Sequence, residues 1–246
     1  MSPIASQSMY LVKLKDRRQV AERTMAFQFE KPEGFTFEAG QFIDMTLINP
    51  SETDEEGNGR AFSIASAPEE SMLLVATRMR DTAFKRVLGT MPIDSQVKIE
   101  GPFGSLVLHN NQARAAVLLA GGIGITPFHS ILLQATREHW PQRLFCFYAN
   151  RRPEDAPFLE ELEALQRQNP SYTFVPTVTD MRRSDHSWQG ETGRIDQAML
   201  AKHLKSAASP IYYMAGPPGM VRAMRTLLKS MGVDVDDIRT EEFAGY

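Results

Sequence analysis

The pattern of apolar residues changes once along the chain, near residue 108, and this change constrains the fold more than any other feature. Before it, short segments of alternating apolar and polar residues are separated by turn residues, which is typical of an antiparallel barrel or sandwich. After it, fully apolar segments alternate with amphipathic ones, which is typical of β-α-β units around a parallel sheet. The sequence therefore predicts two domains, residues 1–108 and residues 109–246.

The expected elements follow from these two patterns. In the first domain we expect strands at residues 10–15, 24–30, 41–48, 61–65, 72–77 and 96–100, with one helix at 82–88. In the second domain we expect strands at 115–120, 144–149, 172–178, 211–215 and 238–243 and helices at 126–139, 157–167, 196–204 and 220–231. Residues 50–59 are acidic and carry no apolar side chain, which indicates a surface loop. The predicted fold is an N-terminal antiparallel β-barrel followed by a C-terminal α/β domain with a parallel sheet.

Composition excludes several classes of protein. The formal net charge is −3 with both signs interspersed, so nothing favours nucleic-acid binding. The longest apolar stretch, residues 115–128, is too short and too rich in glycine to span a bilayer, and no signal peptide is visible. We therefore expect a cytoplasmic protein without a membrane partner, and a monomer. The single cysteine, Cys146, excludes a four-cysteine iron–sulfur or zinc site within the chain, and the five histidines show no metal-ligand spacing.

A glycine-rich turn follows the first apolar strand of the second domain. Gly121, Gly122 and Gly124 precede Thr126, and Pro127 fits the first turn of the expected helix. Glycines at this point let the backbone approach a pyrophosphate, and the helix N-terminus supplies free N–H groups. Without further support the motif is equally compatible with an ordinary strand-to-helix joint.

A second turn of this kind, with Gly216, Pro217 and Met220, follows the fourth apolar strand. Glycine-rich ends of two strands in one parallel sheet can face each other across the crevice where such sheets bind ligands. Taken alone, this turn is more often structural than functional.

The third motif lies in the barrel half, where the strand sequence reads Arg60, Ala61, Phe62, Ser63. Strand alternation places Arg60 and Phe62 on one face and the other two residues on the opposite face. An arginine beside an aromatic ring and a hydroxyl could hold a phosphate and the edge of a planar ring. A half-buried strand with a surface arginine is the simpler alternative.

Together these motifs resemble those of the ferredoxin–NADP⁺ reductase superfamily of flavoproteins, over about residues 10–246. The family's Arg-x-Tyr-Ser flavin motif matches residues 60–63, with Phe62 in place of the tyrosine, and its Gly-Pro-x-Gly element matches residues 101–104. Its Gly-Gly-x-Gly-x-Thr-Pro nucleotide loop matches residues 121–127, and its late Gly-Pro-x-x-Met element matches residues 216–220. The final residues, 241–246, are similar to the family's flavin-side C-terminus.

The resemblance implies an FAD site in the barrel. Arg60 would pair with the flavin phosphates, Phe62 would pack on the isoalloxazine, and Ser63 would form a hydrogen bond near N5. The remaining flavin contacts would come from Ala61, Ala76, Thr77, Arg78, Thr82 and Ala83, the last two with backbone N–H groups aimed at the pyrophosphate. Ser63, Glu242 and Tyr246 are the candidate catalytic residues, and Phe243 or Tyr246 would cover the flavin face. No metal site is implied.

The resemblance also implies a site for NADPH or NADH, with Thr126 at the nicotinamide end. Arg151 and Arg152 follow the second strand of this domain and could pair with a 2′-phosphate, whereas the acidic residues just after them could bind a free 2′-hydroxyl. The choice of coenzyme stays open. Ala215 stands where many relatives have a cysteine, so no thiol is available beside the nicotinamide.

The function implied is that of an FAD-dependent reductase, which passes hydride from NAD(P)H to flavin and electrons to a separate acceptor. Because the chain has no iron–sulfur ligand set, that acceptor would be another molecule, such as a ferredoxin or an oxygenase component. Two alternatives remain: an NAD(P)H:flavin reductase that uses diffusible flavin, and a non-catalytic electron-transfer or regulatory subunit.

Overall fold

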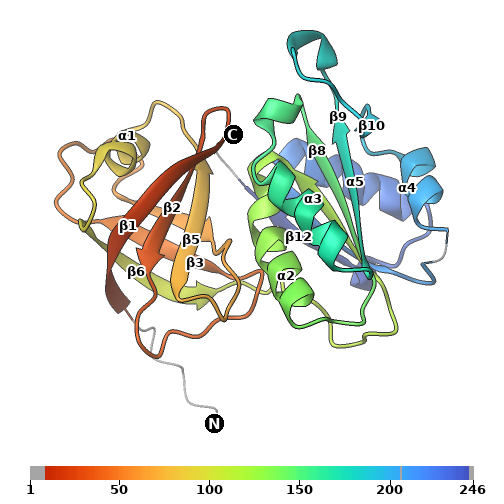
Figure 1. The fold of residues 1–246 in the computed structure, drawn as a ribbon, viewed down its shortest axis with the longest axis horizontal. Coiled ribbons are helices and arrows are strands. Elements are labelled where there is room, and N and C mark those ends of the chain that lie inside the picture. Colours follow the sequence, from red (N-terminus) through yellow and green to blue (C-terminus); the bar gives the residue numbers. More distant parts are fainter. Residues whose placement is uncertain (1–8, 206, 244–246) are drawn as a thin grey trace.

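The computed structural model describes residues 9–205 and 207–243, and it contains two six-stranded sheets that lie side by side (Figure 1). The N-terminal sheet is antiparallel throughout, and the C-terminal sheet is parallel throughout. The chain passes from one sheet to the other between residues 103 and 116. The predicted fold class is confirmed, and the boundary at residue 108 falls within this connection.

The N-terminal sheet curves into a barrel-like shape. Its strands are β1 (Met9–Ala21), β2 (Thr24–Glu30), β3 (Phe42–Leu47), β4 (Gly59–Ser63), β5 (Met72–Arg78) and β6 (Gln96–Phe103), in the order β4-β3-β6-β1-β2-β5. The edge strands β4 and β5 share no ladder, but just beyond β4 the amide of Ala65 donates to the carbonyl of Leu74 at 2.7 Å. Phe27, Phe29 and Met45 fill the interior. The barrel is therefore bridged at its seam without being fully closed.

Strand β1 is much longer than the sequence pattern indicates. Residues 9–13 pair with β6, whereas the stretch from Leu14 to Ala21 pairs with β2. The second part is polar, because it includes Asp16, Arg17 and Arg18, whose side chains are not buried. Alternation of apolar residues therefore stops while backbone pairing continues, and the prediction of a strand ending at residue 15 is wrong.

The C-terminal sheet is doubly wound. Its strands are β7 (Ala116–Gly121), β8 (Leu144–Asn150), β9 (Tyr172–Val178), β10 (Glu191–Thr192), β11 (Ile211–Gly216) and β12 (Ile238–Glu242), in the order β10-β9-β8-β7-β11-β12. The helices are α2 (Thr126–Arg137), α3 (Leu159–Gln168), α4 (Gln197–His203) and α5 (Pro218–Ser230). Strand order reverses between β7 and β11, which is where such sheets bind ligands. Two short 3₁₀ segments, Gly122–Ile125 and Pro153–Asp155, follow β7 and β8.

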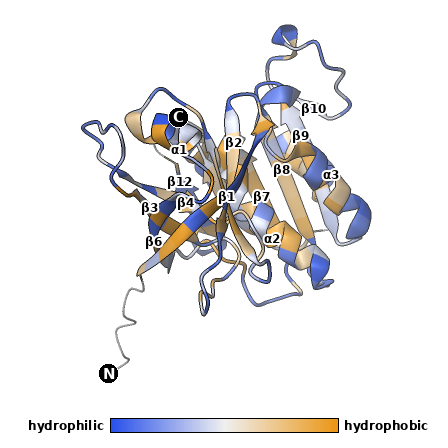
Figure 2. Ribbon diagram, turned by 60° about the vertical axis from the view of Figure 1, so that its left-hand side comes forward, coloured by the Kyte–Doolittle hydropathy of each residue, from blue (hydrophilic) through white to orange (hydrophobic). Residues whose placement is uncertain are grey.

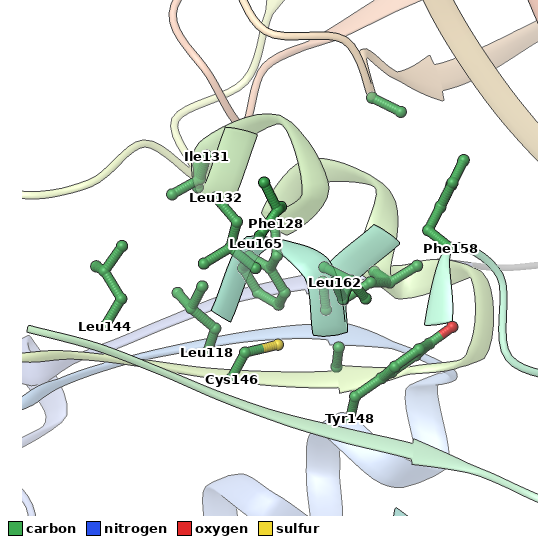
Figure 3. Close-up of a cluster of buried hydrophobic side chains, with 14 of the residues drawn as sticks. Leu118, Phe128, Ile131, Leu132, Leu144, Cys146, Tyr148, Phe158, Leu162 and Leu165 are labelled. Carbon is green, nitrogen blue, oxygen red and sulfur yellow. The ribbon is translucent and has the colours of Figure 1, made fainter. Parts of the chain in front are cut away.

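Helices α2 and α3 cover one face of this sheet, and α4 and α5 cover the other (Figure 1). Leu118 and Cys146 on the strands meet Phe128 on α2 and Leu162 on α3, and all four side chains are fully buried (Figure 3). The central strands β7 and β8 are mostly hydrophobic, whereas polar residues dominate the exposed loops (Figure 2). Burial raises the pKa of the Cys146 thiol, so this cysteine is held in its unreactive thiol form.

The two domains are joined by polar contacts at the start of α2. His129 is buried, and its Nδ1 lies 2.8 Å from the carbonyl oxygen of Ala65, just beyond β4. The Ser130 hydroxyl donates to the carbonyl of Ser66 at 2.6 Å. His129 Nε2 lies 3.1 Å from the Glu161 carboxylate on α3. These bonds hold the start of α2 against the strand that carries Arg60–Ser63.

Candidate functional site

A groove of about 600 Å³ lies where the two domains meet. The barrel contributes β3, β4, β5 and the region before and within the helix α1 (Ala83–Thr90), and the parallel sheet contributes the turn after β7 and the end of β12. The groove is lined by Phe42, Glu56, Arg60, Ala61, Phe62, Ser63, Ala76, Thr77, Arg78, Arg80, Thr82, Lys85, Ile123, Thr126, Glu241, Glu242 and Phe243. Most of the residues predicted to bind flavin therefore line a single cavity.

The Arg60–Ser63 motif forms strand β4 together with Gly59. The guanidinium carbon of Arg60 lies 5.2 Å from the ring centre of Phe84 on α1, and the ring of Phe62 lies 5.8 Å from the same ring. Arg60 and Phe62 thus share a face, as strand alternation predicts. Phe62 and Ser63 are almost fully buried, whereas Ala61 is exposed.

Arg60 is held by the loop that precedes β4. Its Nη1 donates to the carbonyl oxygens of Glu56 at 2.8 Å, Gly57 at 3.2 Å and Gly59 at 2.7 Å. Its Nη2 contacts the Glu56 carboxylate at 2.7 Å and lies 3.6 Å from that of Asp54. The guanidinium is therefore oriented by the protein, with the carboxylates of Glu56 and Asp54 beside it.

Helix α1 begins beside Arg60. Thr82 caps it by accepting from the amide of Lys85 at 3.4 Å. The amide of Ala83, which the sequence assigns to a flavin phosphate, donates to Asp54 Oδ2 at 2.9 Å. Ala83 itself is buried and does not line the groove.

Cationic side chains gather at this end of the groove. Arg60, Arg78, Arg80 and Lys85 all line it, and Lys85 Nζ donates to the carbonyl of Arg78 at 2.7 Å. Burial, reinforced by the neighbouring arginines, lowers the pKa of Lys85 to about 8. Sequence reasoning missed Lys85, although it lines the groove one helical turn after the N-cap Thr82. This concentration of positive charge suits a ligand that carries phosphate groups.

The two glycine-rich turns of the parallel sheet are packed against each other. A Cβ on Gly124 would lie 2.3 Å from the carbonyl oxygen of Ala215, and one on Gly121 would lie 2.3 Å from the Met220 sulfur. Gly216, at φ +152°, would bring a Cβ within 3.1 Å of the Gly121 backbone. The backbone contact between the turns therefore requires glycine at position 124 and leaves little room at position 216, independently of any ligand. Pro217 packs at the same contact, 3.1 Å from the position a Cβ on Gly121 would take.

Ile123 and Thr126 line the groove at the first turn, next to Gly122. Gly122 has φ +53°, a conformation that a branched side chain would strain. The Thr126 hydroxyl donates to the carbonyl of Ile123 at 2.9 Å, and the side chains of both residues line the groove. Of the nucleotide contacts predicted in this motif, Thr126 lines the same groove as the flavin motif, whereas Gly121, Gly122 and Gly124 are not among its lining residues.

The last described strand closes the groove on its other side. Glu241 pairs with Ala215, Glu242 pairs with Gly216, and the amide of Phe243 donates to the carbonyl of Gly216 at 3.1 Å. Burial raises the pKa of Glu241 to about 7, whereas Glu242, predicted as catalytic, is exposed. Strand alternation turns one of two adjacent glutamates inward, and the sequence alone does not say which. Tyr246 lies outside the described residues.

Arg151 and Arg152 have different surroundings. Arg152 forms ion pairs with Glu22 in the β1–β2 turn, with Glu154 at 3.2 Å and with Asp155 at 2.9 Å. Arg151 is exposed, and its carbonyl accepts from the amide of Asp180 at 2.8 Å. Arg152 thus connects the turn after β8 to the barrel, whereas the Arg151 side chain faces solvent. Neither residue lines the groove.

Among residues 9–205 and 207–243, no group of three or more His, Cys, Asp or Glu side chains could hold a metal ion. Over the same residues, none of the helices is both long enough and apolar enough to cross a bilayer.

Comparison with known proteins agrees with this geometry. Residues 118–226 match the family model of the oxidoreductase NAD-binding domain. The F component of the Na⁺-translocating NADH-quinone reductase of Haemophilus influenzae is 30% identical over 201 residues, which cover 76% of this chain and 48% of that protein. Reductase component 2 of terephthalate 1,2-dioxygenase from a Comamonas species is 25% identical over 210 residues, 85% of this chain and 60% of that protein. The chain spans about half the length of the first of these relatives.

A solved structure extends the match to both domains. The ferredoxin NADP⁺ reductase of Neisseria gonorrhoeae, with bound FAD and NADP, superposes with a TM-score of 0.78 at 22% identity, covering 95% of this chain and 98% of that chain. The chain has the fold of the ferredoxin reductase-like proteins. The resemblance inferred from the four motifs is confirmed, and so is the pairing of a barrel-like domain with an α/β domain.

Proposed function

We propose that the chain is an NAD(P)H-dependent flavoprotein reductase that takes FAD into the groove between its domains. Hydride from NADPH or NADH enters there, and electrons leave to a separate one-electron acceptor such as a ferredoxin or an oxygenase component. The observation that carries this proposal is the shared groove, to which the barrel supplies Arg60–Ser63 and the parallel sheet supplies Thr126 and Phe243. The dioxygenase reductase component among the relatives supports this choice of acceptor.

The groove fits FAD in volume and in charge. About 600 Å³ lies within the range of small-molecule and cofactor sites. The cationic end formed by Arg60, Arg78, Arg80 and Lys85 suits a pyrophosphate, and Phe62 offers an aromatic surface beside the Ser63 hydroxyl. FAD would supply the hydride acceptor, and it can release two electrons one at a time.

The chain's own residues would bind and orient the flavin and the pyridine nucleotide, and they would exclude water from the groove. Phe243 lines the groove opposite the barrel wall and would shield a flat ring from solvent. Thr126 would meet the nicotinamide end of the pyridine nucleotide. Burial raises the pKa of Glu241 to about 7, so this carboxyl could hold or release a proton inside the groove. We assign it this role in place of Glu242.

For the coenzyme, the environment of the two arginines favours Arg151 as the side chain that meets a 2′-phosphate. The Arg152 guanidinium already forms ion pairs with three carboxylates. One of them, Glu22, belongs to the barrel, so the loss of Arg152 would loosen the contact between the domains. Arg151→Ala should raise KM for NADPH and leave KM for NADH unchanged. Equal effects on both coenzymes would remove Arg151 from the site.

The proposal is tested by turnover with an artificial acceptor. The protein is incubated with FAD, passed through gel filtration and assayed for NADPH and NADH oxidation with ferricyanide. We expect a flavin spectrum that elutes with a monomer and steady oxidation of at least one coenzyme. Flavin binding without oxidation would favour a non-catalytic subunit, and absence of flavin binding would contradict the proposal. Capture of the native partner from a soluble extract would then identify the acceptor.

A further inference from the structure

The acidic loop before β4 contacts the Arg60 guanidinium and the amide of Ala83. These are the two groups that would bind the flavin phosphates in our proposed function. Three carboxylates in this loop alternate along the chain and contact the region around α1. Glu52 forms a two-point ion pair with Arg86 at 2.9 and 2.5 Å. Asp54 accepts from the amide of Ala83 at 2.9 Å, and Glu56 contacts Arg60 at 2.7 Å.

Asp54 is the residue that occupies the phosphate position itself. Its Oδ2 accepts the amide at the first turn of α1, and its Oδ1 lies 3.6 Å from Arg60 Nη2. A helix N-terminus combined with a guanidinium is the arrangement that proteins use for phosphate. In this chain both donors face a carboxylate from the chain itself.

The loop is also organised internally for this contact. Asp54 Oδ1 accepts from the amide of Glu56 at 3.1 Å, and the carbonyl of Asp54 accepts from the amide of Gly57 at 2.9 Å. This turn presents Asp54 to α1 and Glu56 to Arg60 together. The amide of Ala83 forms one strong hydrogen bond, so it cannot bind Asp54 and a pyrophosphate at the same time. A pyrophosphate at Arg60 would also be repelled by the negative charge of Glu56.

We infer that Asp54, with Glu56, is an internal competitor for the phosphate position of the groove and sets how tightly phosphorylated flavin is held. The inference rests on the proposed FAD site. FAD must displace the carboxylates from the Ala83 amide and from Arg60, whereas riboflavin, which has no phosphate, does not compete there. The competition weakens FAD binding and favours exchange of flavin with solution.

The test measures flavin affinity in the apoprotein by fluorescence quenching. Asp54→Asn removes the charge and retains the side-chain oxygen that organises the turn, and Glu56→Gln does the same at Arg60. The matched control is Glu55→Gln, which removes one charge from the same loop at the exposed residue between them. We expect FAD to bind about threefold to tenfold more tightly to Asp54→Asn/Glu56→Gln than to the control, because the partly exposed carboxylates compete only modestly for the phosphate position. Riboflavin affinity should stay the same in all proteins.

A second measurement follows the loop directly. Hydrogen exchange in residues 52–58 should become faster when FAD binds, because the carboxylates are released, and exchange in α1 should become slower. Unchanged or weaker FAD binding in the double variant, or slower exchange in the loop on FAD binding, would overturn the inference while the FAD site stands. If none of the proteins binds FAD or riboflavin, the proposed function fails, and the inference fails with it.

Discussion

The barrel side of the groove is lined by long charged side chains that bind one another, whereas the side formed by the parallel sheet is a close fit of backbone to backbone. On the first side, Arg60 is shared between Asp54, Glu56 and three carbonyl oxygens. On the second, the turns at Gly124 and Gly216 leave no room for a Cβ. Ionic contacts can exchange one partner for another, but packed backbone cannot. Substitutions should therefore alter ligand affinity on the barrel side and stability on the other.

The largest expected effect is on the packed side. In Gly124→Ala the new Cβ would lie 2.3 Å from the Ala215 oxygen and 2.6 Å from the Gly216 Cα, so the two turns must separate. We expect a loss of about 3 kcal/mol in the free energy of unfolding, measured by urea denaturation. Gly219→Ala is the control, because a Cβ there meets nothing within 4 Å, and its stability should match the wild type. Equal stability of both variants would contradict the packed-turn account.

The next effect tests the charged side. Arg60→Ala should weaken FAD binding by about 1.5–3 kcal/mol, because the phosphate loses its charge-assisted partner. The free energy of unfolding should change much less, since the ion pairs of Arg60 with partly exposed carboxylates of the loop contribute little to stability. Fluorescence titration and urea denaturation measure the two quantities. Arg182→Ala removes a guanidinium that is 93% exposed on the far domain and should change neither. Full FAD affinity in Arg60→Ala would remove this residue from the site.

A smaller effect concerns Glu241, where the two sides meet. Its folded pKa of about 7 lies above the ordinary value of 4.5, so the folded state binds this proton more tightly than the unfolded state. Stability should therefore fall as pH rises from 4.5 to 7, and Glu241→Gln should abolish this fall, which we expect to be about 1 kcal/mol after allowance for solvent screening. Urea denaturation at pH 5 and pH 8 measures it. Glu242→Gln, the exposed neighbour, should retain the wild-type pH dependence.

The smallest effect tests an ion pair within the packed domain. The His129 contact, with help from Arg18, lowers the pKa of Glu161 to about 2 from 4.5. This contribution is present above pH 4.5 and is lost as pH falls toward 2, so Glu161→Gln should cost about 0.5–1 kcal/mol at pH 7 and less at pH 3. Glu160→Gln, next to it and exposed, is the control. A cost that does not change between the two pH values would show that the carboxylate charge is irrelevant.

The same contrast explains which features could be predicted from the sequence. The apolar strands of the parallel sheet and the glycine turns are encoded locally, so strands such as β7 and β9 and the position of Gly121 follow from pattern alone. The contact of Asp54 with the Ala83 amide joins residues 29 apart, and the loop that carries Asp54 has no periodicity to reveal it. Arg152 illustrates the same limit, because its partner Glu22 lies 130 residues away in the other domain. Ion pairs between residues far apart in the sequence were therefore not predictable, whereas the motif Arg60–Ser63, which lines the groove, was found from the sequence.

The central claim is that one groove brings a flavin and a pyridine nucleotide together, and anaerobic mixing tests it most directly. The protein loaded with FAD is mixed in a stopped-flow instrument with NADPH and, separately, with NADH, while the visible absorption of the flavin is recorded. The account predicts that at least one coenzyme bleaches the bound flavin at a rate that saturates with coenzyme concentration. Bound flavin that stays oxidised with both coenzymes would contradict it.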